Sequence, residues 1–107
     1  PYYVQIIMAG FTQKEGAQIY NLDLFGSMST EKFISTGSGS PVAYGYLESE
    51  YREGMTVDTA YKVAMQAIAA AIRRNAGTGD SINVVIIDRN GWRELSKEQK
   101  AAVGVVF

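Results

Sequence analysis

The stretch Ser35-Thr36-Gly37-Ser38-Gly39-Ser40-Pro41 decides how this chain folds. Its two glycines allow positive φ, and its alternating hydroxyls offer hydrogen-bond donors and acceptors. Ser40 before Pro41 predicts an N-cap followed by proline at the first helical position, where its missing N–H costs nothing. We therefore expect a positioning loop and then a helix that runs to about Arg52. The first amides of that helix, beside the Ser38 hydroxyl, would suit an anionic group, although a capped turn is the simpler interpretation.

The residues before this loop predict three strands. Residues 2 to 9 carry apolar side chains on both faces, which is typical of a strand between two covering layers, and Gly10 is expected to end it. Residues 17 to 25 form a second strand that pairs back as a hairpin. A turn at residues 26 to 29 leads to a third short strand, residues 31 to 35, which delivers the chain to the loop.

The residues after the loop predict a second, longer helix. Gly54 ends the first helix, and Thr56 is expected to be the N-cap of the next, with Asp58 in its first turn. The helix is expected to end near Gly77 or Gly79, after two arginines. Its expected buried stripe consists of Val57, Tyr61, Met65, Ile68 and Ile72.

The last third of the chain predicts a hairpin and a short helix. Residues 82 to 88 are apolar on both faces, so we expect a central strand. Asn90-Gly91 is a strong signal for a tight turn, after which residues 92 to 95 pair back. Ser96-Lys97-Glu98-Gln99 has the form of a capping box, which predicts a helix from Lys97.

Composition bounds the class of protein. A chain of 107 residues with 47% hydrophobic and 20% charged residues suits one small globular domain, residues 1–107. A net charge of −1 argues against binding to nucleic acid or to a membrane surface. Without cysteine or histidine we expect no disulfide, no metal site and no cofactor. Without a membrane-spanning run or signal segment, we expect a cytoplasmic protein.

Several runs of residues together resemble the β-type catalytic subunit of the archaeal-type core proteasome. The resemblance implies an α+β fold: a partial αββα layered sandwich, like that of the N-terminal nucleophile hydrolases, with mostly antiparallel strands and three helices. Nearly the whole chain takes part, the tail only loosely. The matching runs are residues 35–41, Tyr44-Gly45-Tyr46-Leu47-Glu48-Ser49, Gly54-Met55-Thr56-Val57-Asp58, residues 73–79, and residues 83–88 on to Gly91.

The resemblance also implies what this polypeptide lacks. In that family the nucleophile is an N-terminal threonine, supported by an aspartate and a lysine in the first half of the subunit. Position 1 here is Pro1, and residues 1–5 resemble a strand near the middle of the family's fold. The chain therefore resembles the C-terminal half, and we expect it to be inactive as a threonine peptidase on its own.

Three positions correspond to the family's supporting catalytic residues. The supporting serine falls on Ser38, and the aspartate and serine after the long helix fall on Asn75 and Thr78. Thr78 keeps the hydroxyl, but the amide of Asn75 cannot accept a proton as a carboxylate does. Without the resemblance, the residue types of Asn75 and Thr78 are typical of a helix C-cap and a turn.

Three functions compete. The first is a fragment of a proteasome threonine peptidase, whose partners would be the missing N-terminal half or proteasome α and β subunits. The second is a scaffold without a peptidase role that self-associates as a dimer or larger species through uncovered sheet faces and edges. The third is a small tautomerase using the secondary amine of Pro1 as its base, which an unchanged turnover of a Pro1→Ala variant would exclude.

Overall fold

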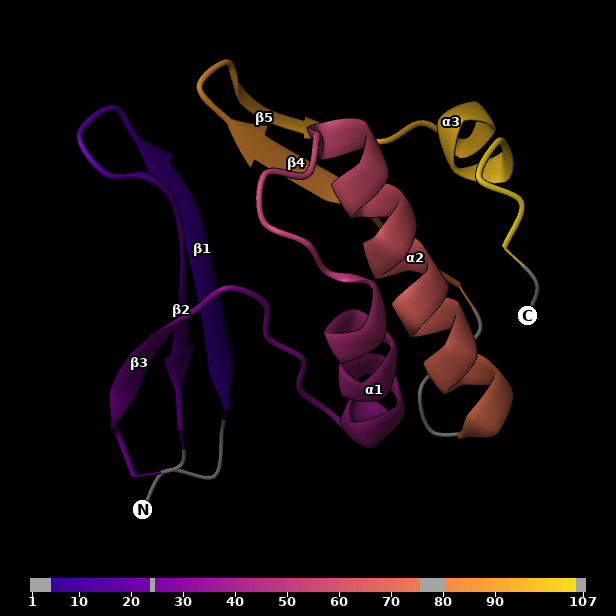
Figure 1. The fold of residues 1–107 in the computed structure, drawn as a ribbon, viewed down its shortest axis with the longest axis horizontal. Helices are drawn as coiled ribbons and strands as arrows, with labels where there is room; N and C mark the ends of the chain where they lie inside the picture. Colours follow the sequence, from indigo (N-terminus) through magenta and orange to yellow (C-terminus); the bar gives the residue numbers. More distant parts are fainter. Residues whose placement is uncertain (1–4, 24, 76–80, 106–107) are drawn as a thin grey trace.

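The computed structural model describes residues 5–23, 25–75 and 81–105. The chain forms a three-stranded antiparallel sheet, then two helices, then a two-stranded antiparallel sheet and a last short helix (Figure 1). This arrangement confirms the predicted α+β class. The elements are β1 (Ile6–Thr12), β2 (Gly16–Leu22), β3 (Met28–Glu31), α1 (Ser40–Glu50), α2 (Val57–Arg74), β4 (Val85–Asp88), β5 (Gly91–Glu94) and α3 (Lys97–Ala101).

The first sheet has the order β1-β2-β3, and its turns differ from the predicted ones. Gly10 does not end β1; it pairs with Gln18 in the ladder. The turn comes earlier than the expected residues 26–29, because the Asp23 carboxylate accepts hydrogen bonds from the amides of Phe25 and Ser27, both at 2.9 Å. The third strand therefore occupies residues 28–31, and the prediction of a strand at 31–35 is wrong.

Helix α1 begins one residue before the predicted start. Gly37, at φ 98°, turns the chain so that the Ser40 amide donates to the Gly37 carbonyl at 3.1 Å. Ser40 is thereby already helical, and the buried Gly39 is the N-cap, with no side-chain hydrogen bond. The prediction of Ser40 as the N-cap is wrong, and Pro41 takes the second helical position and not the predicted first one.

Helix α2 lies between two layers, and this decides which of its residues are buried. Its N-cap is Thr56, as predicted, with the hydroxyl accepting from the Thr59 amide at 3.2 Å. One side packs on α1 through Ala43, Ala67 and Ala71, an alanine seam, and another side packs on Ile82 and the chain after α3 through Met65 and Ala69. The predicted stripe is therefore wrong in part: Val57 and Ile68 are exposed, and alanines take their place because the neighbouring layers approach closely.

The second sheet is a two-stranded hairpin, so the prediction of a central strand at residues 82–88 is wrong within the described part of the chain. Residues 81–84 are not part of a strand, although the Leu95 amide donates to the Val84 carbonyl at 2.9 Å, and β4 begins at Val85. The Asn90-Gly91 hairpin is confirmed, with Asp88 opposite Gly91. The capping box is also confirmed, since the Ser96 and Gln99 side chains each bond the backbone amide of the other residue.

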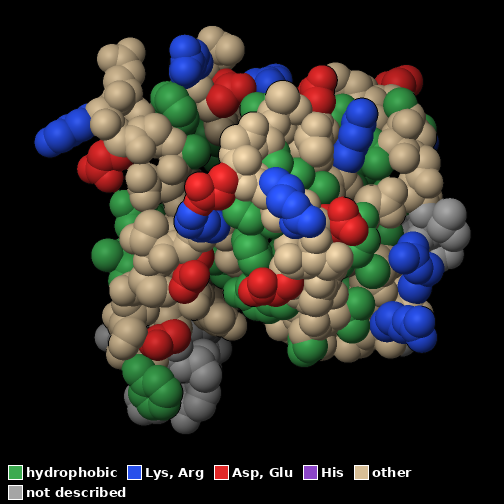
Figure 2. Space-filling view, viewed as in Figure 1, with side chains coloured by type: hydrophobic (Ala, Val, Ile, Leu, Met, Phe, Trp, Pro, Cys, Tyr) green, Lys and Arg blue, Asp and Glu red, His purple; other side chains and the backbone are tan. Residues whose placement is uncertain are grey.

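Apolar side chains remain exposed on both sheets. The outer face of the β1–β3 sheet carries Met8 and Met28, which are 56% and 64% exposed. On the hairpin, Val85, Ile87 and Trp92 share the face opposite to α2, and Trp92 is 72% exposed. Figure 2 shows hydrophobic side chains reaching the surface at the left margin, along the β1–β3 sheet. Among the described residues, β1 therefore lacks the two covering layers that its sequence predicts.

The turn of the β4–β5 hairpin is held by the Asp88 carboxylate. The Asn90 amide donates to it at 2.9 Å, and the Arg93 guanidinium donates at 3.0 Å. The Asn90 hydrogen bond first, and then the Arg93 contact, hold the pKa of Asp88 below its usual range. Because the pKa of Asp88 is lower in the folded chain than in the unfolded chain, the ionised carboxylate stabilises the hairpin at pH values above the pKa of the unfolded chain.

We expect this stabilisation to be lost as pH falls through the lowered pKa of folded Asp88. The emission of Trp92, the only tryptophan, reports on the same hairpin. An acid titration should show a change in Trp92 emission that is absent from an Asp88→Asn variant. An identical acid transition in the variant would show that another group controls the hairpin.

Candidate functional site

The loop before α1 lies against the C-terminal half of α2 and encloses a small hollow, the loop hollow. Its volume is about 150 Å³, well below the roughly 300–1,000 Å³ typical of sites for drug-sized ligands. None of its side chains titrates near neutral pH, so the lining residues supply no general base. They are Ser35, Thr36, Gly37, Ser38, Gly39, Ala43, Ile68 and Ala71.

Two of the three predicted site residues meet beside this hollow. Asn75 is the C-cap of α2, and its Nδ2 donates to the backbone carbonyl of Ser38 at 3.0 Å. The bond joins positions 37 residues apart in sequence. Thr78, the third predicted residue, lies outside the described residues, as does Pro1, the proposed tautomerase base.

The predicted anion site at the start of α1 does not form as expected. The Ser40 amide donates to Gly37, and the Val42 and Ala43 amides both donate to the Gly39 carbonyl. These amides are therefore already used within the turn. The simpler interpretation, a well-structured turn, describes this end of α1.

The direction of the Ser38–Asn75 bond explains why an amide suits position 75. A carboxylate accepts hydrogen bonds but cannot donate one to a carbonyl oxygen. Because this bond is exposed, we expect Asn75→Asp, which loses it and places a negative charge beside the Ser38 carbonyl, to lower the unfolding free energy by about 0.5–1.5 kcal/mol.

Chemical denaturation of the wild-type and Asn75→Asp chains at equal concentration tests this expectation. Arg73→Gln, on the same turn of α2, is a control for a general change in charge at this helix end. An Asn75→Asp variant as stable as the wild type would contradict the structural role of the amide.

A second hollow, the inter-sheet hollow, separates the β1–β2 hairpin from α2 and β4. Its volume is about 370 Å³, and its lining is largely apolar. The sequence does not predict this gap, because the alternation of apolar residues indicates which side chains share a face and not what covers them. The lining residues are Ala9, Gly10, Ala17, Gln18, Ile19, Val57, Ala60, Tyr61, Ala64, Val84, Val85, Ile86 and Ile87.

The described residues offer little for other kinds of site. Among them, no group of three or more acidic, histidine or cysteine side chains is placed to hold a metal ion. None of the helices in the described ranges is long and apolar enough to cross a membrane.

Comparisons with known proteins agree on one family. The model for the proteasome subunit family matches residues 1–87. The chain is 52% identical over 103 residues to proteasome subunit beta 2 of Nitrosopumilus maritimus (strain SCM1), which covers 96% of this chain and 49% of that protein. Proteasome subunit beta 2 of Cenarchaeum symbiosum (strain A) gives the same identity and coverage.

A third relative, proteasome subunit beta of Methanopyrus kandleri, is 50% identical over 100 residues, covering 92% of this chain and 47% of that protein. The chain thus spans about half the length of the curated relatives it matches. Its α+β architecture, its antiparallel sheets and the match over residues 1–87 agree with one another. The chain belongs to the proteasome subunit family.

Proposed function

We propose that residues 1–107 form the C-terminal, scaffolding part of a β-type threonine peptidase subunit, folded as a single domain. Relatives named as proteasome β subunits match this chain over about half of their length, which supports the assignment. The two antiparallel sheets facing the inter-sheet hollow correspond to part of an αββα sandwich. As part of this proposal, the chain acts in the cytoplasm.

The supporting catalytic positions in this proposal are Ser38, Asn75 and Thr78. The hydrogen bond from Asn75 to the Ser38 carbonyl supports the placement of these two residues in one site. The residues that line the loop hollow supply no base, and the position of the supporting aspartate is held by the amide of Asn75. Because nucleophile and base carry the chemical step, the polypeptide alone is expected to be inactive.

The observation that carries the proposal is the uncovered apolar surface on both sheets. Ala9 and Ile19 on the first sheet and Val85 and Ile87 on β4 all line the inter-sheet hollow, and the latter two side chains are exposed. An exposed apolar patch of this kind marks an association site. Its natural cover in this proposal is the N-terminal half of a β subunit, within an assembly of α and β subunits.

The test is to mix the 107-residue chain with the N-terminal half of the Nitrosopumilus maritimus relative and to assay a fluorogenic peptide. We expect no cleavage by either half alone and measurable cleavage by the mixture. An N-terminal half with its nucleophile replaced by alanine is the control, and it should remain inactive. Cleavage by the 107-residue chain alone would contradict the proposal.

The same exposed surfaces favour a second candidate, a self-associating scaffold without peptidase activity. Two copies can cover each other through a closed two-fold contact between apolar faces. Sedimentation should then show a dimer or larger species, and the double variant Met8→Lys, Met28→Lys should shift it toward the monomer. A compact wild-type monomer at micromolar concentration would exclude self-association through this face.

A further inference from the structure

A third hollow lies between α2, α3 and the segment at Ile82, and it differs from the other two in its charge. Its volume is about 260 Å³. Its apolar part includes Met65, which is 2% exposed, and Ile82, which is 9% exposed. Ala101 and Val105 complete the apolar lining, and the polar lining residues are Ser81, Lys97 and Lys100. We call it the dilysine pocket.

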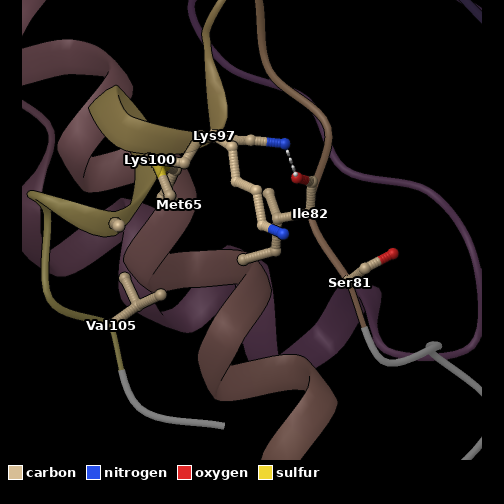
Figure 3. Close-up of a pocket in the computed structure, with 7 residues that line it drawn as sticks. Met65, Ser81, Ile82, Lys97, Lys100 and Val105 are labelled. Atoms are coloured by element: carbon tan, nitrogen blue, oxygen red, sulfur yellow. Dashed lines mark hydrogen bonds between the residues drawn. The ribbon is translucent and has the colours of Figure 1, made fainter.

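The two lysines are held on one side of α3. Positions 97 and 100 are three residues apart in a helix, so their side chains are neighbours. Figure 3 shows both ammonium groups reaching from α3 toward the segment at Ile82. The Lys100 Nζ donates to the Ile82 carbonyl at 3.0 Å, which fixes one of the two charges over the pocket.

Neither charge is neutralised by a carboxylate among the described residues. The ion pairs there join Lys32 with Glu53 and Arg93 with Asp88. Each ammonium group has three donors, and Lys100 spends one of them on Ile82. Two neighbouring positive charges with unused donors favour an anion that bridges them.

From this combination we infer that the dilysine pocket binds a short aliphatic monocarboxylate, with the tail against Met65 and the carboxylate between Lys97 and Lys100. The volume lies just below the roughly 300–1,000 Å³ of drug-sized sites, so a tail of about five or six carbons suits it. Both a short fatty acid and the last residue of a peptide ending in leucine or valine have this chemistry. The site shares no lining residue with the loop hollow or the inter-sheet hollow, and it goes beyond the proposed function.

Methionine methyl NMR tests the inference, because the chain has four methionines and Met65 alone of them lines this pocket. Titration with hexanoate should shift the Met65 methyl signal saturably, with a dissociation constant on the order of 1 mM. Met8, Met28 and Met55 serve as internal controls and should not move. Hexanamide and hexylammonium, which have the same tail without the negative charge, should bind at least threefold more weakly.

Three variants separate the charge from the cavity. Lys97→Gln should weaken hexanoate binding about threefold, as expected for one exposed ion pair, whereas Lys14→Gln in the β1–β2 turn should have no effect. Ala101→Leu keeps both lysines but fills the apolar part, so it should abolish the saturable shift. Lys100→Arg keeps the charge and should retain binding.

Comparing N-acetyl-leucine with hexanoate identifies the source of the ligand. Tighter binding of N-acetyl-leucine would assign the pocket to peptide C-termini, and tighter binding of hexanoate would assign it to short fatty acids. Equal shifts of all four methionines, equal binding of hexanamide and hexanoate, or unchanged binding by Ala101→Leu would each overturn the inference.

Discussion

Shortening Met65 to alanine is expected to lower the unfolding free energy by about 2–4 kcal/mol, close to the range for removing a buried methionine side chain. Met65 is 2% exposed and packs with Ala69 and Ile82, so its loss removes the central contact between α2 and the segment before β4. For a domain of about 100 residues, this corresponds to a drop in Tm of roughly 10–20 °C.

The matched control is Met28→Ala, which changes the same side chain at a position that is 64% exposed. We expect this variant to stay within about 0.5 kcal/mol of the wild type. Both should be compared at one protein concentration, because self-association makes Tm concentration-dependent. Equal losses for the two variants would show that Met65 is not part of the core.

Enlarging Ala67 to leucine is expected to destabilise the chain through the opposite effect, overpacking. Ala43, Ala67 and Ala71 form the alanine seam between α1 and α2, and each is 1% exposed. Ala67 lines none of the hollows described above, so the added carbons push α1 away from α2, at a cost of about 1–3 kcal/mol. Thermal denaturation followed by circular dichroism measures this loss.

Ala64→Leu is the control for Ala67→Leu, because it makes the same change at an exposed position of the same helix. Ala64 lines the inter-sheet hollow, where additional carbons find space. We expect no loss of stability in this variant. A larger loss for Ala64→Leu than for Ala67→Leu would contradict the alanine seam as the contact between the helices.

Sequence reasoning was most accurate where a few neighbouring residues determine the geometry. Thr56, the Asn90-Gly91 turn and the Ser96 capping box all work through hydrogen bonds within four residues, and the structure has all three. The early turn after Asp23 is equally local, but it depends on a side-chain contact that the pattern of turn residues does not distinguish.

Burial was less predictable because it depends on which layers meet. The apolar positions of α2 follow a helical period, but the helix contacts layers on two sides, so alanines replace Val57 and Ile68 as buried residues. Candidate site positions came from the family resemblance alone. The donation from Asn75 to the Ser38 backbone required coordinates, because the two residues are 37 positions apart.

The order of elements along the chain has a consequence for how the polypeptide acquires its structure. The β1–β2 and β4–β5 ladders and the packing of α1 on α2 each join elements that follow one another directly in sequence. Contacts with short sequence separation require little loop closure, so these units can form within microseconds to milliseconds. When β1 and β2 approach β4, loops of more than sixty residues must close. Few contacts between these strands offset the entropy that is lost on closure. We therefore expect the union of the two sheets to be the slow step of folding.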